Sequence, residues 1–580
     1  MATTRGKNTL VIGIDFGTTY TGVAWLFAKE NTPAKEPEVI CHWLSALSGN
    51  NDRNKVPSKI YYDKYTGAIK WGYNIPTDVQ PIQWFKLLLL EAKDLPVNLQ
   101  HSSHIKTARN MMEKAGKTPV ELVGDYLKVL WEHITSEIKD AKGASLVNGT
   151  RYHVVLSVPA IWKGYARDRM YQAAKRAGIL DYRVVGTTTL DFISEPEAAA
   201  LATLPELDNR DDLAIGDSFV VMDAGGGTVD IISYKVDKLE PMIMSECVEG
   251  DGALCGATFV DKAFESLVER RVGYRAWKEM KTSEISKMIN SEWEHGIKKD
   301  FDGSQDKYRI DLPKRNKRGQ LNVHANEIRG IFQDVLSKVY DMLQKQLDGI
   351  ESRSQKPPKF VILVGGFGRC PFLFKSLKTQ FMRKTDILQD RGEKPWSAIC
   401  RGAALYGAMG HGLTEHAIKV NTRIARLSYG WKFDATFDPK VHDVRDKTWN
   451  DVQGIWRAKN QMEWAIKRGQ DVSAVEPKEY PYAFMFPIQE RGKKTCLKTI
   501  YTSTDKIPSS RLDDTVHHHT AIQLETPKPV QELDKGISNG RQFWAWIYKI
   551  KMQISGAALN ISIHSGDSEV VSSSFIMETS

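Results

Sequence analysis

The sequence lacks several features that define other classes of protein. None of its six cysteines stands in a CxxC pair, which argues for reduced thiols and against a disulfide framework or a zinc site. Its apolar runs are too short to span a bilayer, and its first residues, MATTRGKNTL, contain no apolar signal segment. The net charge of +9 is small for 580 residues, and the lysines and arginines are scattered. We therefore expect a cytoplasmic or nuclear protein that binds neither membranes nor nucleic acids.

Two common nucleotide-binding motifs are also absent. The pattern GxxxxGK[ST] does not occur, which excludes a P-loop protein. No GxGxxG opens a helix after a strand, so a dinucleotide-binding fold is unsupported. Any nucleotide site in this chain must use a different arrangement of glycines.

Apolar spacing predicts the order of elements along the chain. Because 580 residues exceed what one hydrophobic core usually serves, two or more domains are expected. The predicted helices span residues 120–138, 164–177 and 325–350, and predicted strands span 154–158 and 360–364. This alternation continues to about residue 413 and indicates an α/β core.

From residue 417 onward the pattern changes. Short alternating segments, separated by turn residues, predict a separate β-rich module. Residues 424–429 are expected to form one of these segments. The run His517–His519 is predicted to be a solvated loop rather than a metal site, because adjacent residues cannot easily converge on one ion.

Two segments far apart in the chain share one plan. Residues 12–19 (IGIDFGTT) and 220–228 (VVMDAGGGT) each contain an apolar strand that ends in Asp, then a glycine turn and Thr. Another apolar strand follows each copy. Two such copies indicate a duplicated lobe, because the repeats of a solenoid would be much shorter.

These two hairpins carry groups suited to binding a nucleotide. Glycine turns let backbone N–H groups approach a phosphate closely, because no Cβ intervenes. Asp15 and Asp223, at the strand ends, can hold Mg²⁺ through its waters, since this ion dehydrates reluctantly. One hairpin alone would be an ordinary β-turn, whereas two facing copies would clamp a Mg²⁺-nucleotide from both sides.

At these motifs the sequence resembles a known family. Residues 13–22 (GIDFGTTYTG) and 223–230 (DAGGGTVD) resemble the two phosphate motifs of the actin-like ATPase superfamily in its heat shock protein 70 form. Residues 362–371 (ILVGGFGRCP) resemble the adenosine motif, and the resemblance runs through most of residues 8–413. It implies an α/β, actin-like ATPase fold that binds ATP or ADP with Mg²⁺ between two duplicated lobes of mixed sheet flanked by helices.

The resemblance also divides the chain. Lobe I would span residues 8–198, lobe II residues 199–413, and the β-rich module residues 414–580. The module faintly resembles the peptide-binding β domain of the family. Neither the leucine-rich linker nor the long helical lid of the family is recognisable, which points to a divergent, lidless branch as found in fungi.

The resemblance assigns catalytic roles to five residues. It implies that Asp15 and Asp223 organise Mg²⁺ and its waters, and that Glu195 and Asp230 orient water and metal. Lys86 would stand beside the γ-phosphate and stabilise developing charge. The alternative for Lys86 is a surface lysine whose stem covers apolar groups.

The resemblance also assigns contacts to the nucleotide. Those in the phosphate motifs would be Gly17, Thr18, Thr19, Tyr20, Gly225, Gly226, Gly227 and Thr228. Those to adenosine would be Glu294, Lys298, Gly365, Gly366 and Arg369, with the arginine stacked on the base. A surface ion pair is the alternative for Glu294 and Lys298, which are spaced i and i+4. Phe367 and Trp396 replace a serine and an acidic residue of the family, which predicts a more apolar base pocket.

Three functions are compatible with this fold. The first is a chaperone-like ATPase whose nucleotide state modulates the binding of client polypeptides or co-chaperones. The second is a kinase for a sugar or another metabolite, which would need a carboxylate base for the substrate hydroxyl. The third is a nucleotide-gated scaffold or filament protein with low turnover. The form GTTYTG at residues 17–22 favours the chaperone-like ATPase.

Overall fold

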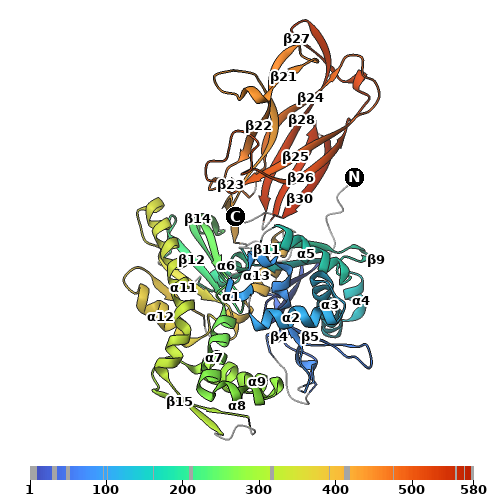
Figure 1. Ribbon diagram of the computed structural model, residues 1–580. Coiled ribbons are helices and arrows are strands. Elements are labelled where there is room, and N and C mark those ends of the chain that lie inside the picture. Colours follow the sequence, from blue (N-terminus) through green and yellow to red (C-terminus); the bar gives the residue numbers. More distant parts are fainter. Residues whose placement is uncertain are drawn as a thin grey trace. The chain divides into compact units, whose positions relative to one another are not determined.

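The structure of the chain is a computed structural model. It describes residues 9–28, 36–46, 53–76, 78–95, 97–100, 102–160, 162, 164–207, 213–313, 319–390, 392–410, 418–474, 476–555, 558–566 and 568–576. The chain divides into two compact units, residues 1–419 and 420–580 (Figure 1). The predicted boundary between residues 413 and 414 lies outside the described residues. Within the described part, no helix is long and apolar enough to cross a membrane.

The first unit begins with a mixed sheet. Its strands are β1 (Thr9–Phe16), β2 (Tyr20–Ala28), β3 (Glu38–Val39), β4 (Lys55–Pro57), β8 (Arg151–Val158) and β11 (Thr189–Ser194). They run in the order β11-β8-β1-β2-β3, and β4 also pairs with β2. β1 is antiparallel to β2 and parallel to β8, and all its residues are buried. A strand covered on both faces is apolar throughout, which is why TLVIGIDF shows no alternation.

A second mixed sheet repeats this arrangement. Its strands are β12 (Ser218–Ala224), β13 (Val229–Lys238), β14 (Ile243–Ala253), β17 (Phe360–Val364) and β18 (Asp386–Leu388). They run in the order β18-β17-β12-β13-β14. β12 is antiparallel to β13 and parallel to β17. In the same way, β1 of the first sheet is antiparallel to β2 and parallel to β8. The two sheets confirm the predicted α/β architecture.

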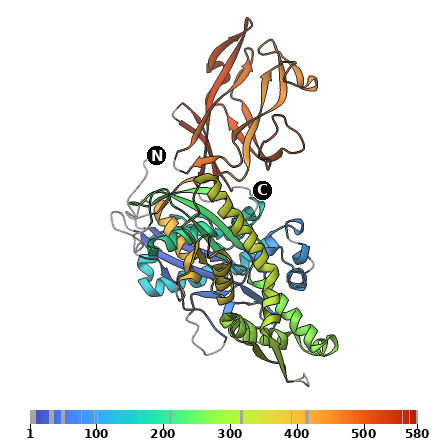
Figure 2. The same ribbon diagram turned by 90° about the vertical axis from the view of Figure 1, so that its left-hand side faces the viewer.

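Helices flank both sheets (Figure 1). The longer ones are α2 (Ser103–Lys114), α3 (Pro119–Lys142), α5 (Gly164–Arg176), α6 (Glu195–Thr203), α7 (Ala257–Val272), α11 (Ala325–Ser354), α12 (Pro371–Phe381) and α13 (Lys394–Gly410). The three predicted helices are confirmed as α3, α5 and α11. α3 begins at a capping box of Thr118 and Glu121. α11, the long helix in Figure 2, buries its apolar face against α7, β13 and β14.

Shorter elements connect the longer ones. The helices are α1 (Val97–Gln100), α4 (Ala144–Asn148), α8 (Tyr274–Glu279), α9 (Thr282–Met288) and α10 (Lys298–Asp300). The strands are β5 (Lys59–Tyr62), β6 (Ile69–Trp71), β7 (Ile82–Gln83), β9 (Tyr182–Arg183), β10 (Gly186–Thr187), β15 (Lys307–Asp311) and β16 (Gln320–His324). They form small sheets outside the two mixed sheets.

The last helix of the first unit returns to the first sheet. α13 packs on β1, β2 and β8 and on α6. The packing requires glycine, because a Cβ added to Gly402 would lie 1.7 Å from the carbonyl oxygen of Ala198. The sequence-based division places residues 394–410 in lobe II, whereas this helix completes the core of the first sheet. The first lobe is thus built from two separate stretches of chain.

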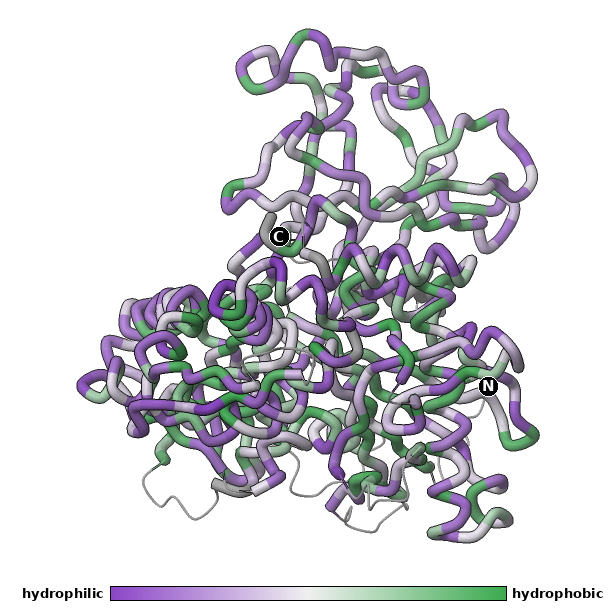
Figure 3. The backbone as a smooth tube through the Cα atoms, turned by 60° about the horizontal axis from the view of Figure 1, so that its bottom comes forward, coloured by the Kyte–Doolittle hydropathy of each residue, from purple (hydrophilic) through white to green (hydrophobic). Residues whose placement is uncertain are grey.

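The second unit contains two antiparallel sheets that share one core. One sheet holds β20 (Ser428–Thr436), β21 (Lys447–Asn450), β22 (Ile455–Ile466), β25 (Thr495–Ser503) and β26 (His517–Glu525). The other holds β24 (Lys478–Pro487), β27 (Asp534–Ser538), β28 (Arg541–Ser555), β29 (Ala558–Ser565) and β30 (Ser568–Ile576). Trp431 and Ile500 of the first sheet meet Trp546 and Ile550 of the second in the core. Figure 3 shows hydrophobic and hydrophilic residues interspersed along the chain of this unit, and its two sheets confirm the predicted β-rich module.

Two details predicted for this unit are wrong. Residues 424–429 do not form one strand. The strand β19 (Lys419–Ile424), which pairs with β23 (Asp471–Ser473), ends at Ile424, and the next strand, β20, begins only at Ser428. His517–His519 is the start of β26 rather than a loop. The buried-exposed alternation of β26 begins only after Thr520, so its first residues give no strand signal in the sequence.

Candidate functional site

The two predicted phosphate motifs form hairpins of the same design. In the hairpin between β1 and β2, the N–H of Gly17 donates to the carbonyl oxygen of Tyr20 over 3.1 Å. In the hairpin between β12 and β13, Gly225 donates to the carbonyl oxygen of Thr228 over 2.9 Å. Each turn follows the aspartate near the end of its first strand, as the sequence predicts.

The two hairpins face each other at close range. A Cβ added to Gly226 would lie 2.2 Å from Oγ1 of Thr19, and one added to Gly227 would lie 2.5 Å from Oγ1 of Thr18. Real Cβ atoms do not approach other atoms this closely, so a larger residue at either position would displace the facing threonine side chain. The structure therefore brings the two motifs together in one place.

A Gly226→Ala substitution should test this contact. The added methyl group would press on the Thr19 side chain, and overpacking of this kind typically costs about 1–3 kcal/mol of unfolding free energy. Nucleotide affinity should fall with it, because the turn that would receive phosphate is displaced. Urea denaturation and ADP titration measure the two effects.

Gly330→Ala is the matched control. Gly330 lies exposed on α11, and a Cβ there would meet no other atom within 4 Å. Alanine in a helix interior is favoured over glycine by about 0.5–1 kcal/mol, so this variant should be as stable as the parent or more stable. Equal behaviour of the two variants would contradict the close contact of the hairpins.

Four buried carboxylates surround the hairpins: Asp15, Glu195, Asp223 and Asp230. Burial, followed by repulsion from Glu195 and Asp15, raises the pKa of Asp223 well above its ordinary value. Burial and repulsion from Glu195 raise the pKa of Asp230 to about 7. Repulsion among these side chains means that the predicted catalytic carboxylates lie close to one another. Together they give the region an excess of negative charge.

Lys86 points toward these carboxylates. It lies on the 3₁₀ helix Phe85–Leu89, and its Nζ donates to Oε1 of Glu195 over 2.8 Å. Its side chain is 3% exposed, and its Nζ lies 5.9 Å and 5.2 Å from the ring centroids of Phe16 and Trp162. The alternative of a surface lysine is therefore wrong. Its place beside a γ-phosphate stays a prediction.

Lys55 was not among the site residues that the sequence predicted, but the structure places it at the site. Its Nζ donates to Oδ2 of Asp15 over 2.5 Å, and Oγ of Ser157 donates to Oδ1 of the same carboxylate over 3.2 Å. Lys55 begins β4, which pairs with β2 beside the first hairpin. A single lysine before Val56 and Pro57 carries no chemical signal by itself, so only the fold reveals this contact.

The adenosine motif touches the second hairpin. Gly365 has φ +87°, and a Cβ there would lie 2.3 Å from Oδ1 of Asp223. Phe367, in contrast, turns away into the hydrophobic core of the second sheet, where its ring lies 6.4 Å from that of Phe332. The expectation that Phe367 makes a base pocket more apolar is therefore wrong, because its ring fills the core.

Trp396, the other replacement, does lie among predicted nucleotide contacts. Its indole nitrogen would be 3.3 Å from a Cβ on Gly366, and its ring centroid lies 5.4 Å from that of Tyr20. The guanidinium of Arg369 lies over the same ring at 5.4 Å and forms an ion pair of 2.7 Å with Glu393. Arg369 already faces an aromatic ring, and its stacking on a base stays a prediction.

Glu294 and Lys298 form an ion pair in which the lysine is buried and the glutamate is partly exposed. Lys298 is buried and binds both Glu294 and Asp261, the latter over 2.8 Å. Burial disfavours its charge, but Asp261 and Glu294 outweigh burial and raise the pKa of Lys298. Burial and repulsion from Glu294 raise the pKa of Tyr20, which places this pair near the first hairpin. The segment is the π-helix Ile289–Ile297 followed by α10, and Glu294 and Lys298 pair across the junction of the two.

The residues present fit a hydrated divalent cation. Oδ1 of Asp223 and Oδ2 of Asp230 are buried and have no hydrogen-bond partner among the described residues. Two buried ammonium groups, those of Lys55 and Lys86, face the four carboxylates, so negative charge is in excess. No three acidic, histidine or cysteine side chains of the described residues converge closely enough to ligate an ion directly. A Mg²⁺ ion held through its waters matches both observations.

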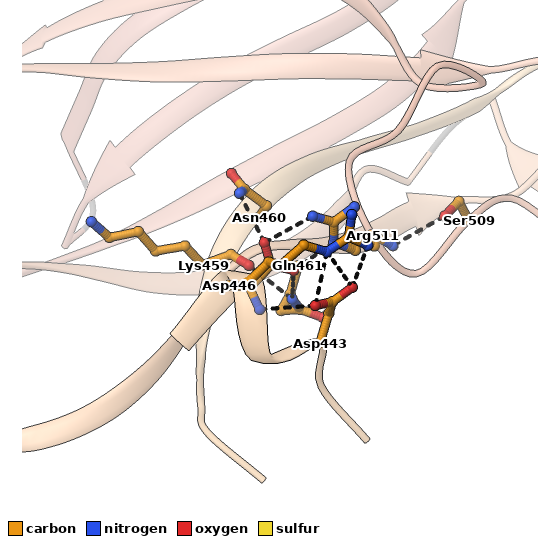
Figure 4. Close-up of polar contacts among 8 residues, drawn as sticks. Asp443, Asp446, Lys459, Asn460, Gln461, Ser509 and Arg511 are labelled. Atoms are coloured by element: carbon orange, nitrogen blue, oxygen red, sulfur yellow. Dashed lines mark hydrogen bonds and ion pairs between the residues drawn. The ribbon is translucent and has the colours of Figure 1, made fainter. Parts of the chain in front are cut away.

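A second polar cluster lies in the C-terminal unit (Figure 4). Asp446 accepts hydrogen bonds from Arg511 over 2.5 Å and 3.0 Å. It also accepts bonds from the side chains of Asn460 and Gln461 over 3.2 Å and 3.3 Å. The cluster ties the loop before β26 to β22, which is a structural role.

The two matching mixed sheets and their facing hairpins give the first unit the actin-like ATPase fold. Residues 91–440 match the family described as "Hsp70 protein". This match covers more than half of the chain, and the chain belongs to the Hsp70 family.

Named relatives extend the likeness beyond this region. The chain is 24% identical to heat shock 70 kDa protein 12A of Mus musculus over 507 residues, which cover 73% of this chain and 71% of that protein. It is 26% identical to heat shock 70 kDa protein 12B of Homo sapiens, over 46% of this chain and 45% of that protein. It is 25% identical to chaperone protein DnaK of Thermosipho africanus (strain TCF52B), over 70% of this chain and 59% of that protein.

Proposed function

We propose that this chain binds ATP or ADP with Mg²⁺ between its two glycine hairpins and hydrolyses ATP. The backbone N–H groups of the turns would contact the phosphates, and Asp15 and Asp223 would hold the metal through waters. Lys86 would stabilise the charge that develops on the transferred phosphoryl group. Asp230, with its pKa of about 7, can accept a proton from an attacking water near neutral pH. Bound Mg²⁺ would neutralise charge on the phosphates.

The observation that most strongly supports this proposal is that the two glycine hairpins face each other. Gly226 and Gly227 lie within van der Waals reach of Thr19 and Thr18, so backbone and hydroxyl donors from both sheets surround one small region. The Hsp70 relatives support the same conclusion at the level of the family.

Calorimetric titration with ADP and ATP in the presence of Mg²⁺ tests the binding step directly. We expect saturable binding of one nucleotide per chain. A protein that is folded by circular dichroism and binds neither nucleotide would contradict the proposal.

The proton-accepting Asp230 also keeps the kinase alternative open, because it would serve a sugar hydroxyl as well as a water. Phosphate release and ATP consumption should therefore be measured with ATP alone, with a panel of sugars and with peptides. ATP consumption without phosphate release, dependent on a sugar, would indicate a kinase. Phosphate release that peptides stimulate would indicate the chaperone-like function.

We further propose that the C-terminal unit binds extended client polypeptides with fast release. β24 forms an edge of its sheet, and an extended chain can add to such an edge by main-chain hydrogen bonds. The described residues between 418 and 576 contain no α-helix that could cover a bound peptide. Affinity differences among related complexes lie mostly in the off-rate, so an uncovered peptide should leave quickly.

Fluorescent-peptide binding with and without ATP tests this prediction. We expect rapid dissociation of the peptide and only a weak effect of ATP on its affinity. The sequence contains no recognisable leucine-rich linker through which the nucleotide site could influence the peptide site. Slow release with a large ATP effect would refute the prediction. No binding at all would favour a unit with a purely structural role.

A further inference from the structure

Asp15 differs from the other predicted metal-binding aspartate in its surroundings. Both of its carboxylate oxygens accept a hydrogen bond, Oδ2 from Lys55 over 2.5 Å and Oδ1 from Ser157 over 3.2 Å. Asp223, at the equivalent place in the second hairpin, has an Oδ1 without a partner among the described residues. The two hairpins share a backbone design, but only the first already holds a cation.

The fold fixes the position of this cation. Lys55 lies on β4, where it is the register partner of Gly22 on β2. A Cβ on Gly22 would lie 3.1 Å from Cε of Lys55 and 3.2 Å from Sγ of Cys400, so the lysine stem lies directly over this glycine. The side chains of Lys55 and Asp15 are 6% and 4% exposed. The ammonium group is thus a fixed part of the site and not a mobile surface charge.

Lys55 keeps its positive charge despite its burial. Its Nζ lies 2.5 Å from the carboxylate of Asp15, and an opposite charge at this distance favours the charged form of a buried lysine. A charge in a buried site acts on a neighbouring phosphate more strongly than one in water does. The ammonium therefore stands where it can neutralise part of the charge of a phosphate bound at the first hairpin.

We propose that Lys55 acts as a resident cation of the phosphate site, so that nucleotide binding retains most of its affinity without a divalent metal. The proposal rests on the function proposed above, because it assumes that ADP binds between the hairpins. Lys55 would supply fixed positive charge on the side of Asp15, and a hydrated metal, held chiefly through Asp223, would add charge on the other side. Lys55 is then a binding residue that sets the metal dependence of the site.

The test compares ADP affinity in Mg²⁺ with ADP affinity in EDTA. For the wild-type protein the loss on removing the metal should be less than about tenfold. For Lys55→Met, which keeps the apolar stem and removes the charge, the loss should exceed about 100-fold, because the metal then becomes the main source of positive charge. Lys64→Thr, an exposed lysine in the turn between β5 and β6, should behave as the wild type.

A second variant separates a loss of binding from a loss of folding. Lys55→Met leaves the buried Asp15 unpaired, which is destabilising, whereas Asp15→Asn/Lys55→Met removes both charges. The double variant should recover the thermal stability lost by the single variant, yet its ADP binding should remain strongly dependent on metal.

The outcomes separate this proposal from the proposed function. If wild-type protein binds ADP in Mg²⁺ but loses more than about 100-fold in EDTA, the resident-cation proposal is overturned and the proposed function stands. The same holds if the Lys55 variants show the metal dependence of the wild type. If folded wild-type protein binds ADP under neither condition, both proposals are overturned.

Discussion

A Lys86→Met variant should hydrolyse ATP at least about 100-fold more slowly than the wild-type protein, while its affinity for ADP stays within about tenfold. Lys86 is buried and its Nζ reaches Glu195 over 2.8 Å, so its charge is positioned within the carboxylate cluster. Removing a preorganised charge that stabilises a transferring phosphoryl group commonly costs orders of magnitude in rate. ADP lacks the γ-phosphate and should therefore lose little binding. Single-turnover phosphate release and ADP calorimetry measure the two quantities.

The buried ion pair complicates this substitution, because it leaves Glu195 without its partner. Breaking one side of a buried pair can cost about 3–5 kcal/mol of stability. Lys86→Met/Glu195→Gln removes both charges and should restore the thermal stability without restoring turnover. Lys93→Met, an exposed lysine paired with Glu91, is the matched control and should hydrolyse ATP at the parental rate. Parental turnover in the Lys86 variant would show that this lysine has no role in hydrolysis.

The stability of the nucleotide-free protein should depend on pH through Asp230. The pKa of Asp230 is raised by burial and by Glu195 from 3.8 to about 7 on folding. Between these values the folded state binds a proton that the unfolded state has lost, so the stabilising contribution is present at low pH and is lost as pH rises through 7. A shift of this size corresponds to about 4 kcal/mol.

Asp230→Asn should remove this dependence, since the amide cannot ionise. The variant should match the wild type in unfolding free energy near pH 4 and exceed it by about 4 kcal/mol at pH 8. Urea denaturation across this range, without nucleotide or metal, measures the difference. Asp237→Asn, on the same strand at its partly exposed end, is the control and should produce no such growing difference. A constant difference between wild type and Asp230→Asn at all pH values would contradict the raised pKa.

Local patterns allowed much of the site to be predicted. The two hairpins were found because each combines an apolar strand, an aspartate and glycines within nine residues or fewer, and such turns form from neighbouring residues alone. The long helices α3 and α11 follow in the same way from apolar residues at helical spacing.

Contacts between distant residues were not predictable. Lys55 meets Asp15 across 40 positions, and nothing near it in sequence distinguishes it from a surface lysine. Phe367 lies within the segment that resembles an adenosine motif, but whether its ring faces a pocket or the core depends on Phe332 and its neighbours. The π-helix Ile289–Ile297 contains Trp293, which stacks on Phe264 from a distant part of the sequence.

The return of α13 to the first sheet has a consequence for biosynthesis. Residues 9–194 leave the ribosome first, but Val11, Ala24 and Leu26 of the sheet pack against Cys400 and Ala404 of α13. At about 5–20 residues per second, the roughly 200 residues that separate β11 from the end of α13 take about 10–40 s to synthesise. During that time the nascent sheet exposes an apolar face and depends on protection from aggregation. A fragment ending at residue 198 lacks α13 and would leave these apolar side chains without that packing.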